Sequence, residues 1–194
     1  MTRSVVQLGG QALKLDADGD TTIQVSSDDV LIVDTAGNEA LKINADGYVT
    51  KPLQPYFHVG IDTTGGATPQ SNISNSAYVN ITLDSEIIDR GGNFASSTFT
   101  APVTGTYHLT LNIRLDNVDT AASYYNLVIA TSNRHHQQLF TLPDSDIPIM
   151  SFKFTAIADM DASDTAYCRI FQNGGTSQTD INGYNTSFYG YLLG

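Results

Sequence analysis

The segment that decides the fold is GTYHLTLNIRLD, residues 105–116. Its large apolar side chains are Tyr107, Leu109, Leu111, Ile113 and Leu115, and they alternate with polar side chains. Alternation with a period of two is typical of a β-strand with one buried face and one polar face. We therefore predict a strand here whose odd-numbered residues face a core.

Similar short runs, each bounded by Gly, Asn, Asp or Pro, lie on both sides of this strand and predict further strands. We expect these strands at Tyr56–Ile61, Ala77–Leu83, Phe94–Thr100, Ser123–Thr131, Gln137–Leu142, Ile149–Ala158, Thr165–Gln172 and Ser187–Leu193. Of the 20 acidic residues only Glu39 and Glu86 are Glu, and the rest are Asp, which favours turns over helices. The sequence thus predicts an all-β protein, an antiparallel sandwich or jelly roll.

The charge of the chain argues against nucleic-acid partners. The 20 acidic residues outnumber the 9 Lys and Arg, and the net charge is -11. Such a chain repels phosphate backbones, so we expect no nucleic-acid binding. The first ten residues, MTRSVVQLGG, lack an apolar signal-peptide core, and no run is long enough to span a membrane. We expect a protein made in the cytoplasm of its host cell, without a signal peptide and without membrane insertion.

A short repeat organises the first fifty residues. The segments ALKLDADG and ALKINADG begin at Ala12 and Ala40, which are 28 residues apart. Between them turn residues recur about every ten positions, which predicts a string of β-hairpins. Such hairpins bury too little to fold alone, so they either dock on the rest of the chain or wind with sister chains, and we favour a trimeric stalk. The prolines of KPLQP, residues 51–55, place the boundary between a stalk of residues 1–51 and a head of residues 52–194.

The aspartates of the first repeat are a candidate calcium loop, because alternating carboxylate oxygens suit a hard cation. The glycine and the terminal glutamate of an EF-hand are not at the required positions, and the second repeat lacks two of the acids. A tight hairpin explains both copies, so we predict no cofactor and no metal, with calcium as the alternative.

Two motifs carry a resemblance to a known family. The stretch FTAPVTGTY, residues 99–107, is similar to the F-x-A-P-x-x-G-x-Y signature of the globular head of complement component 1q, a relative of the tumour necrosis factor jelly roll. The ending SFYGYLL, residues 187–193, resembles the terminal strand of that family. The resemblance covers Pro55 to Gly194 and implies a homotrimer of jelly rolls whose last strand lies beside the first. It implies core or trimer roles for Phe94, Phe99, Pro102, Gly105, Tyr107, Phe188, Gly190 and Tyr191, but it names no ligand.

Within this signature, packing explains each residue. We expect Phe99 and Tyr107 to anchor the core, Pro102 to fix the connection between their strands, and Gly105 to permit a tight turn. The chain lacks the collagen stem that precedes many animal members of the family.

No catalytic motif is found, and we predict that the protein is not an enzyme. The candidate ligand-binding residues are Arg134, His135 and His136, a cationic tip in an acidic chain that suits an anionic sugar or a metal. Tyr124, Tyr125, Tyr184 and Tyr189 could stack on sugars, although strand aromatics more often belong to a core or a subunit interface.

Taken together, these features resemble the fibre or appendage proteins of tailed bacteriophages. We expect a trimeric virion protein whose head binds a host-surface glycan or protein and whose residues 1–51 bind other virion proteins. A capsid decoration protein is the first alternative, and a secreted lectin-like module is the second. An enzyme such as a glycan depolymerase ranks last, because it would need paired carboxylates in a cleft, and Asp144 with Asp146 in a loop is too weak a candidate.

Overall fold

The computed structural model describes residues 11–66, 70–142 and 147–194, and Asp144 and Asp146 lie outside them. The chain forms two compact units, residues 1–54 and 55–194. Every regular element in the described ranges is a β-strand, and the strands pair in antiparallel ladders. The predicted all-β class is therefore confirmed. None of the described segments is a helix that could cross a membrane.

The N-terminal unit is one five-stranded sheet in which each strand pairs with the next along the chain. Its strands are β1 (Leu13–Lys14), β2 (Thr22–Ser27), β3 (Val30–Thr35), β4 (Asn38–Ile43) and β5 (Val49–Thr50). The two repeats form equivalent turns, with Gly19 and Gly47 at φ of 79° and 85°, where a side chain would be strained. The predicted hairpins thus join into a continuous meander whose strands pair within a single chain.

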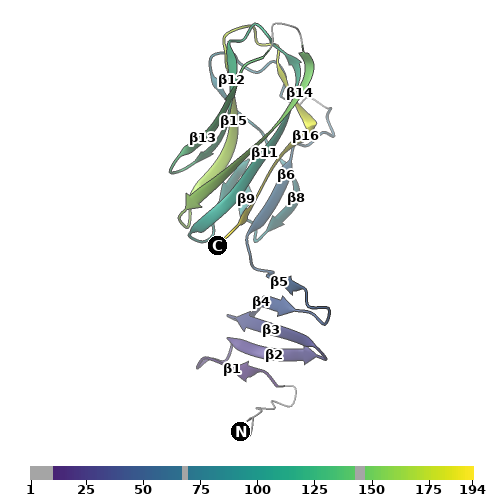
Figure 1. Ribbon diagram of the computed structural model, residues 1–194, viewed down its shortest axis with the longest axis vertical. Helices are drawn as coiled ribbons and strands as arrows, with labels where there is room; N and C mark the ends of the chain where they lie inside the picture. The colour runs from purple at the N-terminus through teal and green to yellow at the C-terminus, as the bar shows by residue number, and fades with distance from the viewer. Residues whose placement is uncertain (1–10, 67–69, 143–146) are drawn as a thin grey trace. The chain divides into compact units, whose positions relative to one another are not determined.

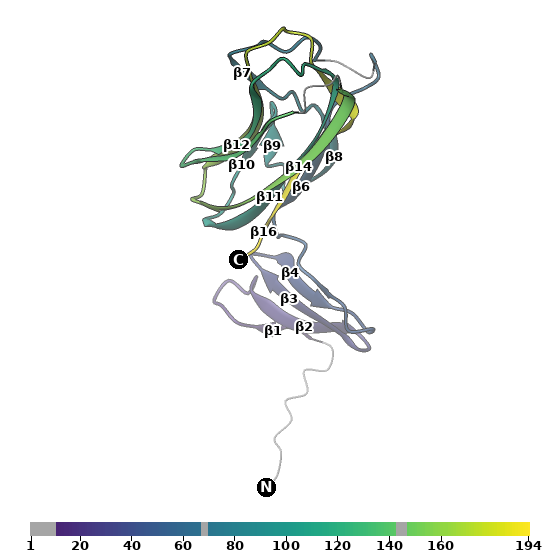
Figure 2. The ribbon, with the colours of Figure 1, turned by 45° about the horizontal axis from the view of Figure 1, so that its top comes forward.

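The head, residues 55–194, consists of two sheets (Figure 1 and Figure 2). The five-stranded sheet has the order β14-β11-β16-β6-β8, with β6 (Tyr56–Gly60), β8 (Ser85–Arg90), β11 (Gly105–Val118), β14 (Ile147–Met160) and β16 (Asp180–Leu192). The six-stranded sheet has the order β13-β12-β15-β10-β9, and β7 pairs with β15. Its strands are β7 (Tyr78–Asn80), β9 (Phe94–Ala95), β10 (Thr98–Thr100), β12 (Tyr124–Thr131), β13 (His135–Phe140) and β15 (Thr165–Asn173). The last strand, β16, lies between β11 and β6, the first strand of the head.

Strand β11 occupies the predicted position, and its odd-numbered residues from Tyr107 to Leu115 are completely buried. The core between the sheets is richest in aromatic rings around Phe57. The ring centroid of Phe57 lies 4.5 Å from that of Phe99 and 5.0 Å from that of Phe188. The ring of Tyr107 packs 5.5 Å from Phe99, and its hydroxyl donates a hydrogen bond to the Val103 carbonyl oxygen at 2.7 Å. These rings tie together strands from both sheets.

Several strand boundaries differ from the prediction. The single strand expected at Phe94–Thr100 is wrong, because Ser96 and Ser97 both adopt positive φ and make a two-residue hairpin between β9 and β10. Of the strand expected at Ala77–Leu83, only Tyr78–Asn80 forms a strand, β7. Strand β8 was not predicted, because Glu86, Asp89 and Arg90 obscure its alternation. The last strand begins at Asp180 and not at Ser187, since a bulge interrupts its pattern.

At Gly190 and Gly105, two glycines of the family motifs, neighbouring atoms lie close to the position that a Cβ would occupy. A Cβ on Gly190 would lie 2.7 Å from Leu109 Cδ2 and 2.8 Å from Phe57 Cε1. A Cβ on Gly105 would lie 2.7 Å from Leu192 Cδ1. The expected role of Gly105 in a tight turn is wrong, since Gly105 begins β11 and its backbone is not left-handed. A side chain there would require the Leu192 side chain to move.

We predict that Tyr107→Ala lowers the free energy of unfolding of the head by about 3–5 kcal/mol, because it leaves a cavity between the two sheets. Tyr107→Phe removes only the hydrogen bond to Val103 and should cost about 1 kcal/mol. Urea unfolding measures both values. Tyr184→Ala is the control, because the Tyr184 side chain is 66% exposed. A Tyr107→Ala protein as stable as the Tyr184→Ala control would contradict the assignment of Tyr107 to the core.

Candidate functional site

The predicted ligand-binding tip is the turn between β12 and β13. The Thr131 side chain fixes this turn, because its hydroxyl donates to the Arg134 carbonyl oxygen at 2.9 Å and accepts from the Arg134 amide at 3.0 Å. The tip is also tied to the turn between β14 and β15, where the Thr165 amide donates to Ser132 Oγ at 2.8 Å. The candidate residues therefore project from a braced hairpin.

Strand alternation separates the two histidines. His135 is exposed and points to the outer face of the six-stranded sheet, beside Ala130. His136 lies opposite Ile129 on the inner side and is partly buried. Burial and, to a smaller extent, the positive charge of Arg134 lower the pKa of His136. The structure therefore does not bring Arg134, His135 and His136 together as one surface, and their role in ligand binding stays a prediction.

His135 belongs instead to a cluster around Arg169, which we name the arginine cluster (Tyr78, His135, Tyr167 and Arg169). Arg169 Nη2 lies 3.2 Å from His135 Nδ1 and 3.3 Å from Nε2. The guanidinium carbon lies 4.1 Å from the centre of the Tyr78 ring and 5.9 Å from that of Tyr167. Two cation–π contacts and a histidine ring thus hold the guanidinium on the outer face of the sheet.

Arg169 has no carboxylate partner among the described residues, where the ion pairs are Lys42–Glu39 and Arg114–Asp116. Its Nε is buried and makes no hydrogen bond within those residues. A guanidinium carries five N–H donors and binds a carboxylate through two of them. In a chain of net charge -11, an arginine without a carboxylate partner is a candidate site for an anion from outside.

Aromatic rings extend this surface along the same face. Phe171 packs 5.0 Å from Tyr78 and 6.1 Å from Tyr124, measured between ring centroids. Tyr78 is 45% exposed, and Leu139 on β13 is also exposed. Flat rings beside a fixed cation suit a ligand that joins a carboxylate to an apolar or sugar face.

Arg169, Tyr78 and Tyr167 were not predicted from the sequence as candidate binding residues. The alternation of β15 could have placed Tyr167, Arg169 and Phe171 on one face. Tyr78 joins them only through the pairing of β7 with β15, a register between distant segments. The sugar-stacking candidate Tyr125 is completely buried, and its hydroxyl lies 2.8 Å from Thr179 Oγ1 and donates to the Asp119 carbonyl oxygen at 3.0 Å. Tyr125 therefore belongs to the core.

The outer face of the five-stranded sheet carries a second surface, which we name the assembly face. Its members lie on four neighbouring strands and are aromatic, histidine or aliphatic: Tyr56, His58, His108, Ile157, Tyr189 and Tyr191. The rings of His108 and Tyr191 stack at 4.9 Å, and His58 packs 5.6 Å from Tyr189. Ile157 is 54% exposed, and the buried Nδ1 of His108 has no partner among the described residues.

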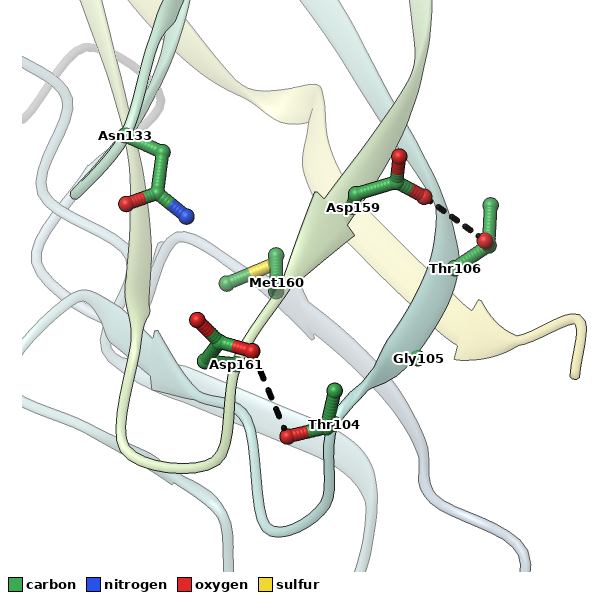
Figure 3. Close-up of a pocket in the computed structure, with 7 residues that line it drawn as sticks. All are labelled: Thr104, Gly105, Thr106, Asn133, Asp159, Met160 and Asp161. Carbon is green, nitrogen blue, oxygen red and sulfur yellow. Dashed lines mark hydrogen bonds between the residues drawn. The ribbon is translucent and has the colours of Figure 1, made fainter.

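Two cavities open on the head. The larger, about 520 Å³, lies where the bulge of β16 interrupts the five-stranded sheet, and His58, Asn112 and Tyr184 are among its lining residues. The smaller, about 210 Å³, is shown in Figure 3. There Asp159 accepts a hydrogen bond from the Thr106 hydroxyl at 2.7 Å, and Asp161 accepts one from Thr104 at 3.4 Å. Each carboxylate thus accepts a hydrogen bond from a neighbouring threonine hydroxyl.

The candidate calcium residues lie together in the N-terminal unit. One carboxylate oxygen from each of Asp16, Asp18 and Asp20 lies within 4.8 Å of the others, and all three side chains are exposed. Hydrogen bonds from Thr21 and Gly19 lower the pKa of Asp16 to about 2, whereas incomplete hydration and the Asp16 charge raise the pKa of Asp20. Backbone donors already bind Asp16, as a tight turn requires. Calcium binding here stays untested.

Comparison with known proteins supports the fold. The sequence matches no family model and no curated protein. Among solved structures, the globular domain of zebrafish complement 1qA protein is similar over 73% of this chain and 98% of that domain, with a TM-score of 0.52 and 14% identity. Murine APRIL at pH 8.5 is similar over 72% of this chain and 99% of its own, with a TM-score of 0.48 and 11% identity.

The similarity to the zebrafish complement 1qA domain identifies the fold of the head. The head is a jelly roll of the complement 1q and tumour necrosis factor type, as its motifs predicted. The similarity shows the fold of the head, and it assigns no ligand and no source. The bacteriophage assignment stays a proposal.

The lowered pKa of His136 predicts how stability depends on pH. The unfolded chain binds this proton with the ordinary pKa of 6.5, whereas the folded chain binds it less readily. The contribution of neutral His136 to the free energy of unfolding is therefore fully present above pH 6.5. It is lost as the pH falls through the lowered pKa of the folded state. We expect His136→Gln to make the unfolding free energy vary less between pH 7.5 and pH 5, as measured by urea unfolding.

Arg134→Gln should also flatten this dependence, because it removes the second cause of the lowered pKa. A wild-type pH dependence in the His136→Gln protein would contradict the placement of His136 at the inner side of the sheet.

Proposed function

We propose that the protein is a homotrimeric, non-enzymatic binding module of a tailed-bacteriophage virion, a fibre or appendage protein. Its head binds a host-surface glycan, and residues 1–51 attach it to other virion proteins. The observation that carries the binding role is Arg169, a fixed guanidinium without a carboxylate partner among the described residues. It is flanked by the exposed ring of Tyr78 and the partly buried ring of Tyr167. The acidic composition and the N-terminal repeat are the features that support a virion protein.

The assembly face supports the homotrimer. Cross-strand register aligns Tyr56, Tyr191, His108 and Ile157 in one row across four strands. Exposed apolar surface of this kind favours association. The buried Nδ1 of His108, which has no hydrogen-bond partner within the described ranges, needs one that a second chain would supply. The resemblance to complement 1q heads implies the same surface, with the last strand beside the first.

We predict that light scattering gives a mass of three chains of 20.9 kDa each. Ile157→Asp should raise the concentration at which the trimer dissociates by more than about tenfold, because it places a charge in a desolvated interface. Val103→Asp is the matched control, since Val103 is an exposed aliphatic residue of a loop. A wild-type mass near one chain would refute the trimer, and equal effects of the two substitutions would exclude this face as the interface.

The arginine cluster favours a carboxylate-bearing sugar over a neutral one. A carboxylate would satisfy donors of Arg169 that have no partner among the described residues, and the exposed ring of Tyr78 would face the sugar ring. Arg134 projects from the adjacent hairpin tip and adds positive charge close to the same sheet edge. The charge of the rest of the chain repels anions, which restricts anion binding to this region.

We predict that the protein binds polygalacturonate more tightly than its neutral methyl ester. Arg169→Gln should weaken binding about tenfold or more, because it removes a charged hydrogen-bond partner. Arg169→Lys should retain part of the affinity that Arg169→Gln loses, because it keeps the charge. Arg114→Gln is the control and should leave binding unchanged, since Arg114 already pairs with Asp116. Biolayer interferometry at two salt concentrations measures these affinities.

The same measurement with polyglutamate tests whether the sugar is needed. Equal binding of polyglutamate would indicate an acidic protein as the ligand, and unchanged binding by Arg169→Gln would refute the site. Imaging of particles locates the protein on a tail or on a capsid. Uniform coverage of the capsid would replace the fibre proposal with a decoration protein, and absence from particles would favour the secreted lectin-like module.

A further inference from the structure

The N-terminal sheet separates its side chains into an aliphatic face and a polar face. Register aligns Leu13, Ile23, Val33 and Leu41 in one row across β1 to β4. A second row on the same face contains Val25, Leu31, Ile43 and Val49 across β2 to β5. These eight residues, all Leu, Ile or Val, form the aliphatic face.

The opposite face contains mostly polar side chains. Lys14 pairs with Thr22 and Thr22 with Asp34, while Lys42 pairs with Thr50. Val30 and Ile32 of β3 are the apolar exceptions, and Ile32 lies between Gln24 and Lys42. The sheet therefore has one side suited to water and one side that is not.

The aliphatic face is incompletely covered within the described part of this unit. Across residues 11–54 only Thr22 and Ile32 are buried, and both belong to the polar face. Val25 and Val49 of the aliphatic face are 57% and 56% exposed. Leu13 and Ile23 of this face are also exposed, and contiguous exposed apolar surface of this kind marks interaction surfaces.

We propose that the aliphatic face packs against the same face of two further copies of this chain, so that three sheets enclose a dry axis. Each copy keeps its polar face in water. The strands pair within one chain, so the three copies meet through side chains and do not exchange strands.

Two observations favour copies of this chain over another occupant. The face carries no charge or hydrogen-bonding side chain, so it offers no polar feature for a specific foreign partner, whereas identical aliphatic rows complement one another under rotational symmetry. The sheet is also joined to the head by only a few residues, since β5 ends at Thr50 and β6 begins at Tyr56. A trimeric head keeps three such sheets at high effective concentration, and the number three rests on the proposed homotrimer.

The face can be tested in the full chain by thiol cross-linking. Val33→Cys places a thiol at the centre of the aliphatic face, and Gln24→Cys places one on the polar face of the neighbouring strand. The native Cys168 is completely buried, and burial raises its pKa, so it does not compete. Mild oxidation should link Val33→Cys chains into covalent dimers at least about tenfold more than Gln24→Cys chains, because the sheets meet on one side only.

Light scattering on the same samples separates this inference from the proposed function. A trimeric mass without Val33→Cys cross-links would overturn the inference and leave the trimeric head intact, because the face is then covered by something else. Equal cross-linking at both positions would also overturn it, as random collision. A monomeric mass without cross-links would refute both proposals. Val49→Cys and Thr50→Cys, neighbours on opposite faces of β5, repeat the comparison if the first pair does not fold.

Discussion

The packing of Phe57 between Phe99 and Phe188 is the interaction on which the head depends. It joins the first strand, the last strand and the opposite sheet, so it closes the fold between segments more than a hundred residues apart. Gly190 makes this contact possible, because any side chain there would overlap the Phe57 ring. Once these rings interlock, alternation along each strand directs every second side chain outward.

The outward side chains divide the possible functions between the two sheets. The five-stranded sheet presents the aromatic and aliphatic side chains of the assembly face, with charged residues such as Arg114 and Lys153 on the same side. The proposed trimer places the assembly face between chains. The six-stranded sheet presents Arg169 on a platform of rings, which suits a ligand with both a carboxylate and a flat face. The two surfaces lie on opposite sides of one core, so assembly through one leaves the other accessible.

The N-terminal unit differs from the head because its described residues form one sheet, with no second sheet to pack against. It is a single layer of strands, and its repeated turns supply local order without a core. Asp16 accepts hydrogen bonds from the Gly19 and Thr21 amides in the first turn, and Asn44 accepts one from the Tyr48 amide in the second. A single sheet with one aliphatic face is incompletely buried by itself, so its stability depends on what covers that face. The head carries its own core, whereas the described part of the N-terminal unit leaves its aliphatic face incompletely covered.

The sequence by itself determined the all-β class, the central strand at residues 105–116, the division near residues 51–55 and the head type, because these features rest on local alternation, turn residues and a contiguous motif. It did not determine the Ser96–Ser97 turn or the strand at residues 85–90. It also did not determine that His135 and His136 lie on opposite faces of the six-stranded sheet. Only the tertiary structure brought Tyr78 to Arg169 and aligned the two aliphatic rows. Those arrangements depend on the register between strands distant in sequence, and register is set by how the whole core packs, which no local pattern records.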